Sequence, residues 1–207
     1  MEVNYIMERQ QLEKFSDRAI GIAIVLLILV FSLPIGKIAQ QHNWGQSVSH
    51  LVIFGFSFLT ICVFWVALSR VIGFIAKPVL TKKIVCLGVL YFLFLVLLPF
   101  SSVWLAGNPY LPASIRLYSL NLLLGSILYL LLLNAALRLN CHIYQHLTEK
   151  ARLWQKKLAL AGPVLYIASF VVSYFNIYIS FIAIAGALCL YAFLFNRSMP
   201  DTIPENS

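Results

Sequence analysis

Charge is scarce in this chain, and negative charge is the scarcest. Only 11% of its 207 residues are Asp, Glu, Lys or Arg, and Asp and Glu together number 7. Soluble domains carry roughly 25% charged and 45–50% apolar residues, whereas 61% of this chain is hydrophobic and its mean hydropathy is +0.90. The composition excludes an ordinary soluble domain and indicates a membrane protein.

Motifs of catalysis are also missing. The sequence has no G-x-S-x-G, no H-E-x-x-H and no Gly-rich phosphate loop, and no pair of carboxylates falls inside an apolar stretch. We therefore expect no enzyme, no catalytic residue and no cofactor. A T-V-G-Y-G segment is absent as well, which excludes the carbonyl filter of the best-known potassium pores.

The four cysteines lack the paired spacing of a disulfide framework. Cys62, Cys86 and Cys189 fall in apolar stretches, so we predict reduced thiols that fill space. His142 and His146 are four residues apart and could bind a metal together with Cys141. The sequence offers no complete ligand set around them, so we predict no metal site.

Apolar windows long enough to cross a bilayer occupy most of the chain. About 20 apolar residues span roughly 30 Å of hydrocarbon. The last window is too long for one helix, and we divide it near Ser173–Asn176, where polar side chains can form a turn. The prediction is an all-α fold with six transmembrane helices in one domain, residues 1–198, followed by a disordered polar tail, residues 199–207. The windows are 19–35, 48–68, 84–104, 117–137 and 158–195.

Positive charge alternates between the predicted loops. Most Lys and Arg residues precede the first helix or lie between helices 2 and 3 or 4 and 5, whereas the alternate loops hold only Lys37 and Arg116. Under the positive-inside rule both termini are cytoplasmic, in a multi-pass protein of the cell's inner membrane. The formal charge of +8 follows from this bias and from attraction to anionic membrane lipids, so we expect no nucleic-acid partner.

Asp17 stands at the threshold of the first apolar window. The simplest interpretation is an N-cap, in which Ser16 or Asp17 accepts hydrogen bonds from the first turn of the helix. That interpretation does not explain Phe15 beside them. An ionisable group at a membrane threshold also favours a functional role.

The segment Phe15-Ser16-Asp17 resembles the F-S-D signature of the transmembrane protein 175 family. Phe64-Trp65 and Leu97-Leu98-Pro99-Phe100 extend the resemblance over roughly residues 8 to 196. The family comprises potassium channels with six helices per repeat, including short single-repeat proteins in prokaryotes. The resemblance implies a homo-oligomer, with a tetramer favoured, that conducts K⁺ passively, and Trp65 is a candidate partner of the motif.

The chain departs from the family pattern near this motif. Gln11 stands where the family usually has arginine, Arg18 follows the Asp in place of a small residue, and residues 68–70 lack the usual histidine. We hypothesise that Arg18 or Arg70 replaces the missing charge partner of Asp17.

The resemblance also implies that the first helix lines the pore and that apolar side chains form the constriction. An aliphatic stripe with spacings of four, three and four lies on one side of this helix, at Ile22, Leu26, Leu29 and Leu33. A ring of such residues gates by dewetting. The same stripe could instead face lipid or another helix, because lipid tails are as apolar as leucine. We take Ile22, Leu26 and Leu29 as the candidate gate.

Other positions of the first helix complete this prediction. Val25 and Ile28 are expected to face away from the stripe, and Ala19, Gly21 and Ala23 are small positions where a neighbouring helix could approach closely. A non-conducting membrane scaffold or a secondary transporter remains the alternative to a channel. Transporters usually place ionisable or helix-breaking residues at mid-membrane, and few lie in these windows.

Overall fold

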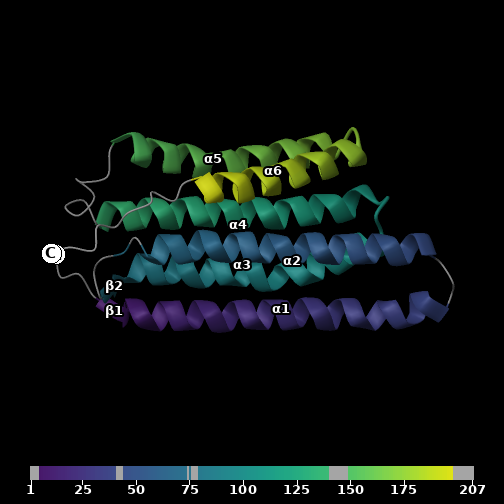
Figure 1. The fold of residues 1–207 in the computed structure, drawn as a ribbon, viewed down its shortest axis with the longest axis horizontal. Coiled ribbons are helices and arrows are strands. Elements are labelled where there is room, and N and C mark those ends of the chain that lie inside the picture. Colours follow the sequence, from purple (N-terminus) through teal and green to yellow (C-terminus); the bar gives the residue numbers. More distant parts are fainter. Residues whose placement is uncertain (1–4, 41–43, 74, 76–78, 140–148, 198–207) are drawn as a thin grey trace.

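The computed structural model describes residues 5–40, 44–73, 75, 79–139 and 149–197. Six helices dominate it, so the six-helix prediction is confirmed (Figure 1). The elements in chain order are β1 (Tyr5–Glu8), α1 (Arg9–Gln40), α2 (Trp44–Gly73), β2 (Val79–Thr81), α3 (Lys82–Gly107), α4 (Pro112–Leu139), α5 (Glu149–Val172) and α6 (Ile177–Arg197).

The helices run nearly parallel to one axis and form a layered bundle (Figure 1). Helix α1 lies along one edge against α2 and α3, α4 packs on α3, and the pair α5 and α6 forms the opposite edge. One end of the bundle holds β1 and β2, and we call it the sheet end. The other end holds the connections 108–111 and Ser173–Asn176, and we call it the turn end.

Four of the helices are long and apolar enough to cross a membrane. These spans are Arg9–Leu33, Ser47–Gly73, Lys82–Gly107 and Pro112–Arg138. In α5 and α6 the described apolar parts, Ala159–Val172 and Ile177–Tyr191, are shorter. A polytopic membrane fold is therefore supported, and membrane crossing by α5 and α6 stays a prediction.

A small antiparallel sheet corrects the prediction of a purely helical fold. β1 pairs with β2 in the register Tyr5↔Thr81, Met7↔Leu80 and Glu8↔Val79, with an irregularity between Tyr5 and Met7. Next to it the Arg9 Nη1 donates to the Ile75 carbonyl at 3.1 Å. The sheet depends on pairing of segments about seventy residues apart, which hydropathy windows cannot reveal, and it fastens the start of α1 to the α2–α3 connection.

The division of the last apolar window is confirmed. Residues 173–176 form a turn between α5 and α6. The Asn176 Oδ1 accepts hydrogen bonds from the backbone N–H groups of Tyr178 at 2.9 Å and Ile179 at 3.4 Å. Asn176 thus caps the first turn of α6.

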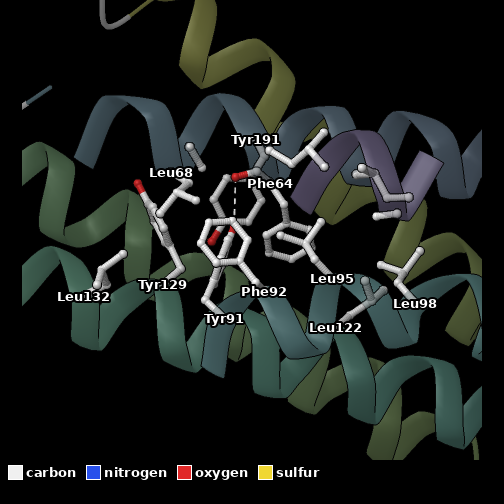
Figure 2. Close-up of a cluster of buried hydrophobic side chains, with 14 of the residues drawn as sticks. Phe64, Leu68, Tyr91, Phe92, Leu95, Leu98, Leu122, Tyr129, Leu132 and Tyr191 are labelled. Atoms are coloured by element: carbon white, nitrogen blue, oxygen red, sulfur yellow. Dashed lines mark hydrogen bonds between the residues drawn. The ribbon is translucent and has the colours of Figure 1, made fainter. Parts of the chain in front are cut away.

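Aromatic side chains fill the centre of the bundle (Figure 2). Tyr91 of α3 is fully buried, and its hydroxyl donates to the Phe64 carbonyl of α2 at 2.7 Å. From the other edge Tyr191 of α6 packs on Gly162, where an added Cβ would overlap the tyrosine ring. A larger residue at position 162 would therefore force the Tyr191 ring to move.

Candidate functional site

Phe15, Ser16 and Asp17 lie inside α1 rather than at its start. The helix begins at Arg9, so Ser16 and Asp17 are two turns beyond its N-terminus and cannot serve as its N-cap. The N-cap interpretation is therefore wrong. It failed because the sheet and Arg9 extend the helix beyond the apolar window from which the boundary was inferred.

The three residues contact different parts of the bundle because each helical residue turns by about 100°. Phe15 packs edge-on against Phe92 of α3, with ring centroids 5.2 Å apart. Ser16 is 1% exposed, and its Oγ has no hydrogen-bond partner among the described residues. On the other side, the Trp65 Nε1 of α2 donates to the Asp17 Oδ1 at 3.4 Å. The motif therefore sits where α1 meets both α2 and α3.

Of the candidate partners of Asp17, the structure brings Trp65 to it. The hydrogen bond is longer than usual, and both side chains are exposed. Arg18 is exposed on α1, whereas Arg70 is half-buried and interacts electrostatically with Tyr129 of α4.

Two polar residues organise the helix start at the position of the family's missing arginine. The Gln11 Oε1 accepts from the backbone N–H of Glu8 at 3.3 Å. Arg9 reaches the Ile75 carbonyl after α2. Both contacts are made to backbone groups, and they hold the start of α1.

Phe92 is the residue of this site that the sequence did not single out. It is buried and contacts both Phe15 and Tyr91, the latter at a centroid distance of 6.2 Å. Tyr91 in turn meets Phe64 of α2 at 6.0 Å. Aromatic residues are common in α3, and no spacing in the sequence distinguishes Phe92 from its neighbours.

The outer face of α1 is apolar, and its aliphatic side chains are not covered by the other residues that the structure describes. Ile22 is 56% exposed and Leu29 is 53% exposed, while Leu26 is only partly exposed. Val25 and Ile28 are also exposed, at 60% and 52%. The exposed face is thus broader than the predicted stripe, and exposure alone does not separate the stripe from Val25 and Ile28.

The small residues of α1 divide between its two faces. Ala19 and Ala23 are buried, as expected for positions of close helix approach. Gly21 is exposed, and an added Cβ there would have no neighbour within 4 Å. Within a single chain the expectation for Gly21 is wrong, because Gly21 lies about 160° around the helix from the buried Ala19 and Ala23.

The described thiols are free, as predicted. Cys62 is partly buried, but Cys86 and Cys189 are exposed, so the last two do not fill space in the core. Among the described residues no group of three or more His, Cys, Asp and Glu side chains could hold a metal. Cys141, His142 and His146 lie outside the described residues, as does the tail 199–207.

Comparisons with known proteins agree with the resemblance found in the sequence. The model of the family described as "Endosomal/lysosomal potassium channel TMEM175" matches residues 11–99, which include α1, α2 and most of α3. No curated protein matches the chain. Among solved structures, a lysosomal potassium-selective channel TMEM175 homologue from Chamaesiphon minutus has a TM-score of 0.73 and 23% sequence identity, covering 91% of this chain and 98% of that one. The chain thus shares the fold of that homologue, and the matched family is one of channels rather than enzymes.

Proposed function

We propose that this relative of the TMEM175 channels forms a potassium channel, in which the outer face of α1 lines the pore. The observation that carries the proposal is the exposed aliphatic face of α1, within the region that matches the family. After Arg18 the sequence of α1 carries no charge until Lys37. A water-filled path beside this face would be interrupted wherever bulky side chains meet.

A pore along this face requires several copies of the chain. One helix cannot enclose a channel, and α1 lies at an edge of the bundle where copies can meet (Figure 1). Closed cyclic symmetry places each α1 residue once per subunit at the same height. We propose a homo-oligomer, with a tetramer favoured by the family resemblance.

The candidate constriction consists of rings of Ile22, Leu26 and Leu29. Their separations of four and three residues correspond to levels roughly 6 and 4.5 Å apart along the axis. Apolar rings exclude water when narrow and conduct when widened. Preference for potassium would then arise without a filter of backbone carbonyls and without a bound cofactor. K⁺ would be the permeant ion.

The motif around Phe15 is suited to hold the orientation of α1. Phe15 contacts Phe92 on α3, and Asp17 contacts Trp65 on α2. Rotation of α1 that re-aims the constriction would have to change one or both contacts. The Ser16 Oγ is buried without a hydrogen-bond partner among the described residues. Such a rotation could bring a partner within hydrogen-bond distance of it.

We further propose that the sheet end faces the cytoplasm of the cell, in the inner membrane. The basic residues of the predicted cytoplasmic segments support this orientation. Tags at both termini should be modified by reagents only from the cytoplasmic side. A tag at either terminus that is accessible from outside intact cells would contradict the orientation.

The experiment that tests the function is ion flux through purified protein in liposomes. With potassium inside and sodium outside, we expect K⁺ efflux down its gradient that exceeds Na⁺ influx, and none in protein-free liposomes. A monodisperse protein that conducts neither ion would contradict the channel and favour a scaffold. If K⁺ flux requires the gradient of a second solute, the protein is a transporter and not a channel.

A further inference from the structure

The turn end of the bundle carries a cluster of exposed aromatic side chains. Tyr110 on the α3–α4 connection is 76% exposed, and Phe175 on the α5–α6 turn is 86% exposed. Tyr174, Tyr178 and Trp104 nearby are also exposed. Tyrosine and tryptophan concentrate at membrane–water interfaces, where their rings reach the headgroup layer. These residues therefore place the turn end of α3–α6 at headgroup depth.

Arg116, in the second turn of α4, lies within this cluster. Its guanidinium carbon is 3.8 Å from the centroid of the Tyr174 ring, a cation–π stack. Tyr174 is itself braced edge-on by Phe170 at 5.9 Å. The Arg116 Nε is buried and has no hydrogen-bond partner among the described residues, although the side chain as a whole remains partly exposed. The guanidinium is thus held by stacking on Tyr174, and no described residue forms an ion pair with it.

Among the residues that the structure describes, no carboxylate lies near Arg116. Three of the acidic residues with described positions, Glu8, Glu13 and Asp17, lie near the sheet end, and Glu149 begins α5 there. The segments around both turns, 98–120 and 166–182, contain no Asp or Glu. A second copy in the same orientation would bring the same segments. Within the described part of the chain no acidic side chain balances Arg116, and an anion from outside the protein can take that place.

We propose that Arg116 binds the phosphate of a membrane phospholipid at the turn end. A planar guanidinium forms paired hydrogen bonds with phosphate oxygens, and stacking on Tyr174 orients it at little entropic cost. Every phospholipid places a phosphate at the depth that the aromatic residues mark. The site is distinct from the lysine-rich sheet end, and it does not depend on ion conduction.

Native mass spectrometry of the purified protein in detergent can test this site. The probes are phosphatidylglycerol, diacylglycerol, which lacks the phosphate, and inorganic phosphate, which lacks the acyl chains. We expect the parent to retain phosphatidylglycerol and neither of the other two at equal concentration. Arg116→Gln should weaken retention of the tightest phosphatidylglycerol about tenfold, the size expected when one charge-assisted contact is lost. Arg116→Lys keeps the charge but loses the planar guanidinium. Its retention of phosphatidylglycerol should lie between that of the parent and that of Arg116→Gln.

Lys83→Gln is the matched control, since it removes one exposed positive charge at the sheet end. It should leave the tightest lipid in place. Tyr174→Leu should weaken retention without changing charge. Equal retention by the parent and a monodisperse Arg116→Gln protein would overturn the proposal, as would equal loss in Arg116→Gln and Lys83→Gln. Equal retention of inorganic phosphate would show a free-anion site and would also overturn the lipid assignment.

Discussion

The two faces of α1 are equally apolar in sequence but differ in their surroundings. The inner face places Ala23, Leu27 and Phe31 in the core, where each is at most 1% exposed. The outer face leaves Ile22 and Leu29 more than half exposed. In a membrane an apolar helix face can meet lipid, another helix or a pore, so hydropathy cannot tell the two faces apart. The comparison teaches that contact with α2 and α3 defines the packing face, and that the other face is available for a partner or a pore.

The largest expected effect is the loss of stability caused by a substitution on the inner face of α1. Leu27→Ala should leave a cavity among α1, α2 and α3 and lower stability by about 2 kcal/mol or more. Leu29→Ala, the same change on the outer face, should stay within about 0.5 kcal/mol. Thermal unfolding of both variants in one detergent measures the difference. Equal destabilisation would mean that Leu29 also packs in a core.

The next effect is on conduction at the outer face. Ile22→Asn and Leu26→Asn should hydrate the constriction and give several-fold more leak with weaker potassium preference, because each substitution changes a whole ring. Val25→Asn and Ile28→Asn are matched controls on the same exposed surface and should conduct like the parent. Flux in liposomes is the measurement. If folded, assembled Ile22→Asn and Leu26→Asn proteins conduct no more than the parent, the assigned gate is wrong.

A smaller effect concerns the contact between Phe15 and Phe92. A double-mutant cycle with Phe15→Leu and Phe92→Leu should give a coupling free energy of about 0.5–1.5 kcal/mol from the edge-on rings. Phe100→Leu serves as control, because Phe100 lies on α3 about 12 Å farther along the helix and should show no coupling. Coupling of equal size in the control would refute a specific contact.

The smallest effect is expected at Asp17 and Trp65. Their hydrogen bond is long and exposed, so Trp65→Phe should lower the free energy of unfolding by less than about 1 kcal/mol. The prediction for function is a shift in the fraction of time the channel is open, visible in single-channel recordings, with Asp17→Asn shifting it the same way. Identical open fractions in the parent and both variants would mean that the contact does not hold α1.

Much of this architecture could be predicted from apolar windows. They located all six helices, and the turn at Ser173–Asn176 followed from polar residues in an overlong window. The aliphatic stripe of α1 could also be inferred from the helical spacing of its residues. These features depend on local sequence, which is why a single chain reveals them.

Features that depend on tertiary contacts could not be predicted. The pairing of Tyr5–Glu8 with Val79–Thr81 extended α1 back to Arg9 and thereby overturned the N-cap interpretation. Phe92 became part of the site only through its contact with Phe15. Gly21 and Ala23 are similar in size, yet they face opposite sides of α1 because of where α2 and α3 lie.

Blocking of introduced thiols tests the central claim most directly, namely that the stripe of Ile22, Leu26 and Leu29 on the outer face of α1 lines the pore. In a protein whose native cysteines are replaced, Ile22→Cys, Leu26→Cys and Leu29→Cys should make potassium flux sensitive to Ag⁺, which enters cation pores and binds thiolates. Val25→Cys and Ile28→Cys should remain insensitive. We predict that Ag⁺ blocks potassium flux through all three stripe variants and through neither control. Block of none of the three stripe variants, or of the controls alone, would contradict the account.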